Sequence, residues 1–158
     1  MIRLFRKADL VSLLFLLLLT GCGVGDDDGQ RLGDYIVGTW QRGWNPGDVV
    51  IEGAPLDEEG NPLWTPENFT YDKFIFNGDG GYNGMVRSGS FCALNVDGDT
   101  IYVGDYRCDN SNLKLNYKNE GKQQSILAQI RSFSENLMVI GYQNEELQVT
   151  VMLTLRKE

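Results

Sequence analysis

The sequence predicts an all-β protein, an antiparallel barrel or sandwich of about eight strands that begins with a short helical turn. Short segments of alternating apolar and polar residues recur from residue 71 to the C-terminus. Clusters of Gly, Asp and Asn separate these segments at spacings of roughly 8–12 residues, which is typical of all-β domains. No segment has the apolar periodicity of a long helix. The chain has 158 residues, the usual length of one domain.

Each expected element follows from its own local pattern. Residues 30–37 can form a short helical turn, and the last expected strand alternates most regularly, with Leu147, Val149 and Val151 on one face. Turn clusters such as the one at 77–81 mark the ends of the strands. The expected strands are 73–76, 82–86, 90–95, 101–107, 113–117, 125–133, 137–143 and 147–155.

A long loop at 43–70 interrupts this pattern. It holds all four prolines of the chain, six acidic residues and no basic residue after Asn45. Because proline cannot donate to a β-ladder, we expect no central strand here, only a short edge strand near 48–52. Trp44 and Trp64 are costly to leave fully in water, so we expect the loop to pack onto the barrel.

The N-terminus predicts an export signal. Basic residues in the first seven positions precede an apolar run at 10–19, which is too short to span a bilayer but suits a signal peptide, assigned here to 1–21. The run ends in Leu19-Thr20-Gly21-Cys22, which resembles the bacterial lipobox. That resemblance implies cleavage before Cys22 and its acylation, including palmitate-type chains, and hence membrane attachment. The alternatives are an ordinary signal peptide with a chance cysteine, or a short buried helix.

An acidic, flexible tether (22–30) follows Cys22 and contains Asp26-Asp27-Asp28. This cluster resembles the surface-export signal of Bacteroidetes lipoproteins, although a solvated linker has the same composition. We therefore expect the barrel domain to occupy 31–158, on an outer-membrane lipoprotein of the cell envelope that is exported to the surface.

Charge and composition exclude several function classes. The formal net charge of −8 argues against nucleic-acid binding. The chain has no histidine, so it lacks His-based triads and the usual zinc ligands. Asp97-Gly98-Asp99 matches a hairpin turn better than a calcium loop. We expect no catalytic residues, no cofactor and no metal; a glycosidase with paired carboxylates is the minor alternative.

The segment Tyr35-Ile36-Val37-Gly38-Thr39-Trp40 contains a Gly-x-Trp motif that resembles the opening of lipocalins, and specifically of the lipocalin-like lipoproteins of Bacteroidetes. The resemblance extends to Arg156 and implies an up-and-down barrel of eight strands. It also implies that Gly38, Trp40 and Arg156 close one barrel end, with the arginine packed across the indole. The 43–70 loop would then cover the open mouth.

Cys92 and Cys108 remain once Cys22 is lipidated. In an oxidising compartment an even pair is commonly a disulfide, which we expect here, against the alternative of two free thiols. A simple hairpin centred on Asp97-Gly98 would place residue 92 opposite 103. The bridge therefore needs a bulge or another strand pairing.

The sequence thus predicts a lipid-anchored, non-catalytic protein that binds a small apolar or amphipathic ligand. Trp44, Trp64 and Tyr142 are the expected contact residues, because amphipathic aromatic side chains are typical anchors. The alternative is a surface module that docks a protein or glycan through the acidic loop. The ligand and the oligomeric state stay open.

Overall fold

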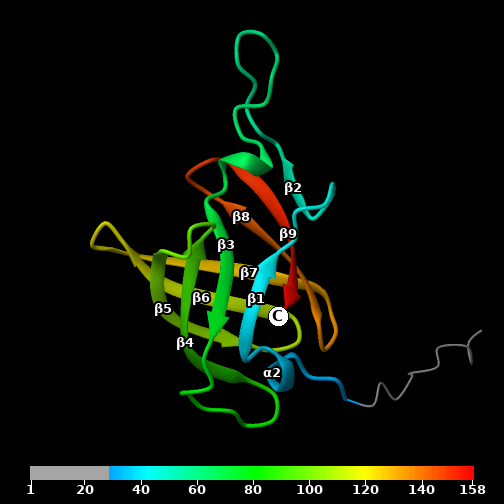
Figure 1. Ribbon diagram of the computed structural model, residues 1–158, viewed down its shortest axis with the longest axis vertical. Coiled ribbons are helices and arrows are strands. Elements are labelled where there is room, and N and C mark those ends of the chain that lie inside the picture. Colours follow the sequence, from blue (N-terminus) through cyan, green and yellow to red (C-terminus); the bar gives the residue numbers. More distant parts are fainter. Residues whose placement is uncertain (1–28) are drawn as a thin grey trace, which may run out of the picture. The chain divides into compact units, whose positions relative to one another are not determined.

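Eight antiparallel strands close into a barrel, which confirms the expected all-β fold with one short helical turn (Figure 1). The computed structural model describes residues 29–158, in which Arg31–Glu158 form one compact unit. Neighbouring strands follow the chain order, and β1 pairs with β9 to complete the ring. The barrel strands are β1 (Gly38–Arg42), β3 (Tyr71–Phe76), β4 (Arg87–Asn95), β5 (Thr100–Cys108), β6 (Asn112–Asn119), β7 (Lys122–Phe133), β8 (Leu137–Asn144) and β9 (Val149–Lys157).

Several expectations fall on residues that are not described. The signal peptide at 1–21, the lipidated Cys22 and most of the tether at 22–30 lie outside the described part of the chain. They stay predictions from the sequence.

Side chains alternate between the barrel interior and the solvent, as the period of a β-strand requires. On β9 the odd-numbered residues from Val149 to Leu155 are buried and the residues between them are half-buried. The same alternation on the other strands fills the interior with apolar side chains. The largest of the fully buried ones are Trp40, Tyr106, Phe76, Phe91, Leu113, Met138, Leu153 and Leu155.

The expected strand at 82–86 is absent, and this prediction was wrong. Only an isolated bridge joins Tyr82 to Arg87, and β4 instead begins at Arg87. Gly84 has a φ of +83°, which breaks the extended backbone. The Tyr82 side chain turns to α2 (Leu32–Tyr35), where its hydroxyl donates a hydrogen bond to Asp34. β1 supplies the eighth barrel strand.

The 43–70 loop contains the expected edge strand, β2 (Val49–Glu52), and a 3-10 turn, η1 (Pro66–Asn68). β2 pairs with the first half of β9, and β1 pairs with its second half. β1 and β2 therefore lie one after the other along the same strand.

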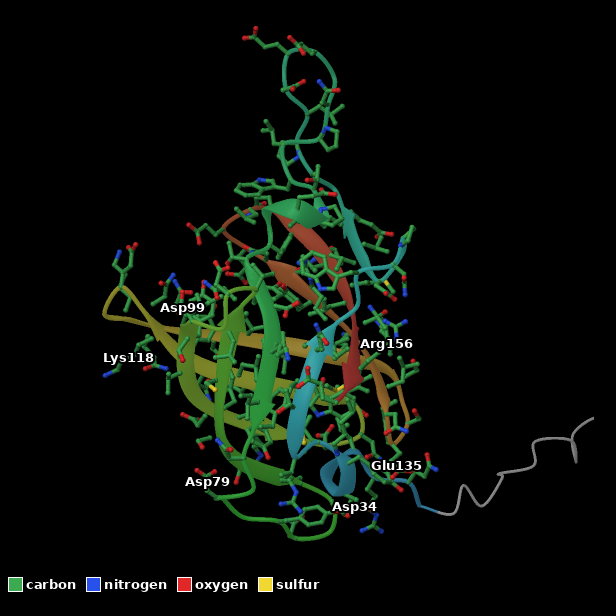
Figure 2. The ribbon with its side chains drawn as sticks, viewed as in Figure 1. Asp34, Asp79, Asp99, Lys118, Glu135 and Arg156 are labelled. Atoms are coloured by element: carbon green, nitrogen blue, oxygen red, sulfur yellow. The ribbon has the colours of Figure 1, made fainter. Side chains whose placement is uncertain are left out.

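The up-and-down topology sorts the connections between the two barrel ends. α2 and the β3–β4, β5–β6 and β7–β8 connections lie at one end, called here the closed end. The 43–70 loop and the β4–β5, β6–β7 and β8–β9 connections lie at the other, called here the open end. In Figure 2, Asp34, Asp79 and Glu135 mark the closed end, whereas Asp99 lies at the open end.

The expected disulfide between Cys92 and Cys108 does not form, and both thiols are free. Cys92 pairs with Val103, as a simple hairpin predicts, whereas Cys108 pairs with Arg87. Cys108 is buried on the inner face of β5, and Cys92 lies half-buried on the opposite face of the sheet. Burial raises the pKa of the Cys108 thiol to about 11, which keeps it protonated.

Candidate functional site

The closed end of the barrel is sealed by α2 and Trp40. Leu32 and Ile36 are fully buried beneath the strands, and the indole Nε1 of Trp40 donates to the carbonyl of Ile36 at 2.7 Å. Lys157 covers the same ring, with its Nζ 5.6 Å from the ring centroid and 2.6 Å from the Tyr35 carbonyl oxygen. Gly38 has a φ of +133°, and a Cβ there would meet the Lys157 side chain at 2.9 Å. A hollow of about 290 Å³ also lies at this end, but none of the sealing residues named above lines it; its walls are Arg31, Met85, Val86, Asp109, Asn110 and Ser111.

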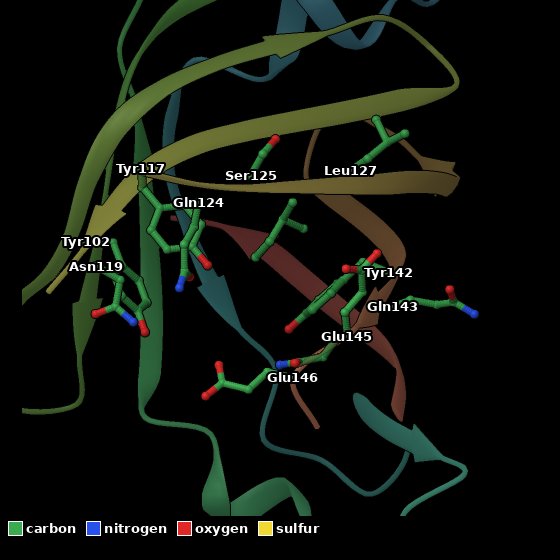
Figure 3. A pocket seen from close by; sticks show the side chains of 12 residues that line it. Tyr102, Tyr117, Asn119, Gln124, Ser125, Leu127, Tyr142, Gln143, Glu145 and Glu146 are labelled. Carbon is green, nitrogen blue, oxygen red and sulfur yellow. The ribbon is translucent and has the colours of Figure 1, made fainter. Parts of the chain in front are cut away.

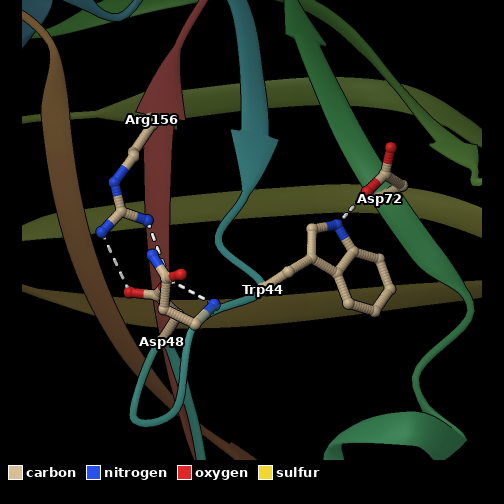
Figure 4. A network of polar contacts seen from close by, with 5 residues as sticks. Trp44, Asp48, Asp72 and Arg156 are labelled. Carbon is tan, nitrogen blue, oxygen red and sulfur yellow. Dashed lines mark hydrogen bonds and ion pairs between the residues drawn. The ribbon is translucent and has the colours of Figure 1, made fainter.

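Arg156 does not pack across the indole, which corrects the role expected for it. The inward positions of β9 are odd-numbered, so residue 157 reaches Trp40 and residue 156 faces outward. Arg156 instead makes a two-pronged ion pair with Asp48, at 2.9 and 3.1 Å (Figure 4). Gly43 leaves space for this pair, because a Cβ there would lie 2.2 Å from Asp48 Oδ2.

The open half of the barrel holds a cavity of about 100 Å³, called here the inner cavity. Its walls are mainly aromatic and aliphatic, and they include Phe91, Ala128 and Leu153, whose side chains are almost fully buried. Phe69, from the 43–70 loop, forms part of its cover. The lining residues are Phe69, Tyr71, Phe74, Phe91, Tyr102, Leu115, Tyr117, Ile126, Ala128, Ile140, Tyr142, Asn144 and Leu153.

A larger hollow of about 650 Å³, called here the outer cavity, adjoins the inner one at the barrel mouth (Figure 3). The two cavities share Tyr102, Tyr117, Ile126, Tyr142 and Asn144, so they form one graded site. The outer cavity is polar where the inner one is apolar. Its other lining residues are Asn119, Gln124, Ser125, Leu127, Gln143, Glu145 and Glu146.

Tyr102, Tyr117 and Tyr142 line both cavities, and a fourth tyrosine, Tyr71, lines the inner one; the four come from four strands. The rings of Tyr102 and Tyr117 lie 4.7 Å apart between centroids, at an interplanar angle of 47°. The hydroxyls of Tyr71 and Tyr142 hydrogen-bond to each other. Tyr142 takes its inward position from the regular alternation of β8. The wall that the two cavities share therefore carries aromatic faces and phenolic oxygens.

Tyr71 reaches the cavity because β3 is irregular at this point. The register of β3 against β4 shifts between Tyr71 and Lys73. Phe74 and Phe76 are buried, so strict alternation would direct Tyr71 outward; the irregularity aims its side chain inward instead. The Tyr71 ring then packs on Phe74, with centroids 5.3 Å apart.

Burial raises the pKa of three of these tyrosines, Tyr71, Tyr117 and Tyr142. It raises the pKa of Tyr142 to about 12 and raises the pKa of Tyr71 well above the ordinary value. The pKa of Tyr117 is also raised, mainly by burial and secondarily by Tyr102 and the carboxylate of Glu146. At neutral pH the hydroxyls can therefore donate hydrogen bonds and carry no negative charge.

The base of the 43–70 loop is fixed to the barrel by Arg42, the last residue of β1. Its side chain is 2% exposed, and its Nη1 donates to the carbonyls of Pro66 and Phe69 at 3.3 and 3.2 Å. The guanidinium also stacks on the Trp44 ring, 3.6 Å from its centroid. Burial lowers the pKa of Arg42, while Tyr71, Asp72 and Glu67 oppose this shift. Arg42 thus holds Phe69 against the inner cavity.

The remainder of the loop lies away from the cavities. Residues 54–63 form a hairpin with a bridge between Leu56 and Pro62, and this hairpin projects from the barrel (Figure 1). Asp57 stabilises its tip by accepting hydrogen bonds from the backbone of Glu59 and Asn61. The loop therefore covers the mouth only through its last residues, less than the resemblance implied.

One of the three expected contact residues lines the site. Tyr142 borders both cavities. Trp44 borders neither; it is 57% exposed, and its Nε1 donates to Asp72 at 2.9 Å (Figure 4). Trp64 packs half-buried against the core and also lines neither cavity.

The sequence reasoning missed most of the site. Tyr102 and Tyr117 occupy inward positions that alternation alone could have indicated. Glu145 and Glu146 lie in the β8–β9 turn, where no local pattern distinguishes a cavity wall from a solvated turn. The inward position of Tyr71 depends on the register shift in β3, and no feature of the sequence predicts that shift.

The described residues contain no group of three or more Cys, Asp or Glu side chains placed to hold a metal ion. Within residues 29–158, no helix combines the length and apolarity that a membrane-crossing helix needs.

Comparison with known families agrees with this geometry. A family model described as a lipocalin-like domain matches residues 36–140, well over half of the chain. The match begins two residues before the Gly-x-Trp motif and ends in β8. No curated protein matches the sequence.

Proposed function

This chain belongs to the lipocalin-like domain family, and from that premise we propose that it is a lipid-anchored binding protein for a small amphipathic ligand. Barrels of this kind generally bind small molecules and are typically not enzymes. The observation that carries the proposal is the pair of connected cavities at the open end. An outer volume of 650 Å³ falls within the range of small-molecule sites, roughly 300–1,000 Å³.

The gradient of polarity along the site supports an amphipathic ligand. The inner cavity offers aromatic and aliphatic walls, and the outer cavity offers carboxamide, hydroxyl and carboxylate groups. An apolar end therefore gains from burial inside, while a polar end keeps hydrogen bonds at the mouth. Docking through the 43–70 loop would require no cavity, so this feature favours ligand binding.

The anchor rests on the sequence alone. We propose that Cys22 is acylated and holds the barrel at the outer membrane, with Asp26-Asp27-Asp28 directing export to the surface. A Cys22→Ser variant should move from the membrane fraction to the soluble fraction. Protease treatment of intact cells should degrade the native protein; protection until the cells are permeabilised would contradict surface exposure.

The binding proposal is tested with the native protein, reconstituted in nanodiscs of zwitterionic lipid, and the neutral fluorescent probe N-phenylnaphthylamine. We expect saturable binding above that of empty nanodiscs. Ala128 is fully buried in the inner cavity wall, so Ala128→Leu should fill the cavity and weaken binding by about tenfold or more.

The matched control is Ala54→Leu, which adds the same bulk at the base of the 43–70 loop, outside both cavities. It should leave probe binding unchanged. Thermal unfolding of each variant shows whether the barrel is intact, and Ala128→Val provides a smaller plug if leucine is too large. Absence of saturable binding, or equal weakening by both leucines, would overturn the proposal.

A further inference from the structure

The two cavities set different limits on the size of what they hold. A dry cavity of about 150 Å³ is enough for a whole benzene ring, so the 100 Å³ inner cavity holds only the apolar end of a ligand, such as a short alkyl group or part of one ring. The outer cavity has several times that volume. Most of the ligand must therefore lie among the polar groups of the mouth.

The charge at the mouth has one sign. Among the described residues that line either cavity, Glu145 and Glu146 are the charged ones, and none is lysine or arginine. The nearby bases Lys118 and Lys122 are exposed on the β6–β7 hairpin and do not line the cavities. Arg42 is buried behind Phe69 and is likewise not part of the lining. Because a concave wall focuses the field of its charges, the mouth attracts cations.

The tyrosines add a second attraction for positive charge. Tyr102, Tyr117 and Tyr142 line the outer cavity, and the negative face of an aromatic ring attracts an ammonium group within about 6 Å. Tyr102 and Tyr117 are tilted against each other at 4.7 Å, and Tyr142 lines the same outer cavity as Glu145 and Glu146 (Figure 3). Aromatic faces and carboxylates thus converge on one volume.

We propose that the preferred ligand is a cationic amphiphile, an organic ammonium whose head lies among the tyrosines and glutamates of the outer cavity and whose short apolar end fills the inner cavity. This inference rests on the proposed function and specifies its ligand class. An anionic head would face two like charges with no base in the cavity wall. A neutral sugar head would keep hydrogen bonds to the cavity wall but would gain no attraction from the negative charges of Glu145 and Glu146.

Three probes with the same tail separate these classes: hexyltrimethylammonium, hexyl glucoside and hexanoate. Each is titrated against bound N-phenylnaphthylamine on the native protein in zwitterionic nanodiscs, with empty nanodiscs as the blank. We expect the ammonium to displace the dye at a concentration about tenfold below that of the glucoside, and hexanoate to be the weakest. Added salt should narrow the difference.

The double variant Glu145→Gln/Glu146→Gln should reduce the preference for the ammonium about fivefold while dye binding persists. Glu135→Gln, at the closed end, is the matched control and should change nothing. If the double variant unfolds, Glu146→Gln alone tests the same point.

Equal displacement by the three probes, or a preference for glucoside or hexanoate, would overturn the cationic assignment. An unchanged preference in the glutamine variants would do the same. In each of these cases the dye still binds and is still blocked by Ala128→Leu, so the proposed function survives. Failure of dye binding itself would instead refute the proposed function.

Discussion

The two ends of the barrel use the same inward positions of the strands for different purposes. At the closed end, Trp40 is fully buried between α2 and Lys157. At the open end, Tyr102 and Tyr142 occupy equivalent inward positions but border a cavity. The closed end has a helix to complete its packing, whereas the open end has only the edge of a loop. What covers a barrel end therefore decides whether its aromatic side chains form core or site.

The largest effect should come from the closed end. Trp40→Ala removes a fully buried indole and its hydrogen bond to Ile36, so we expect the free energy of unfolding to fall by about 3–5 kcal/mol. Tyr102→Ala removes a half-buried side chain at the open end, so it should lower the free energy of unfolding by distinctly less. Urea denaturation of both variants measures the difference. Equal losses would contradict the distinction between a packed end and a binding end.

Arg42→Met should have the next largest effect. It preserves much of the buried volume but leaves the carbonyls of Pro66 and Phe69 without their donor, which costs about 1–3 kcal/mol. The last residues of the 43–70 loop should then exchange amide hydrogens faster than α2 does. Hydrogen-exchange mass spectrometry compares the two segments. Unchanged protection at 66–70 would show that Arg42 does not fix the loop.

Two tyrosine hydroxyls form a matched pair, one at each end. Tyr142→Phe removes the partner of Tyr71 at the open end, and Tyr106→Phe removes a donor to the Asn77 carbonyl, 3.0 Å away, at the closed end. Each should lower stability by about 0.5–1.5 kcal/mol. Only Tyr142→Phe should also alter binding of N-phenylnaphthylamine. An equal change in dye binding for both variants would contradict the placement of the binding site at the open end.

The smallest effect should come from the ion pair between Asp48 and Arg156. The hydrogen bond from Arg156 is the main reason that the pKa of Asp48 is lowered in the folded protein. The pair therefore stabilises the fold above the ordinary aspartate pKa of about 4, and this contribution is lost as the pH falls below that value.

Because the Arg156 side chain is about half exposed, Asp48→Asn should lower the melting temperature by only about 2–4 °C at neutral pH. The variant and the native protein should converge in acid. Thermal scans across the pH range check both statements. A difference that persists below pH 3 or so would show that the charge of Asp48 is not the cause.

Local patterns predicted most of the fold. Alternation placed seven of the barrel strands near their observed positions, and the Gly-x-Trp motif placed the first. The failures share one cause, which is that long-range pairing overrode a local pattern. Residues 82–86 have strand composition, but Tyr82 turns to Asp34 in α2 instead. The two cysteines are an even pair, but the sheet places them on opposite faces.

The site was less accessible to sequence reasoning. Exposed tryptophans on a loop are good general candidates for contact, yet Trp44 stacks on Arg42 and Trp64 packs against the core. Tyr142 does line both cavities, from an inward position of β8. The acidic residues that line the cavity are not those of the conspicuous acidic loop but Glu145 and Glu146 in a short turn.

The sequence by itself determined the all-β class, the closure of one end around Gly38 and Trp40, and the family, because these depend on periodicity and on a short motif. Only the tertiary structure decided which of two consecutive basic residues covers the indole, how far the 43–70 loop covers the mouth, and where the hollow lies. Those outcomes depend on register and on which side chains meet across the barrel. A change of one position along a strand turns a side chain from the interior to the solvent, and a sequence without its pairings does not fix that position.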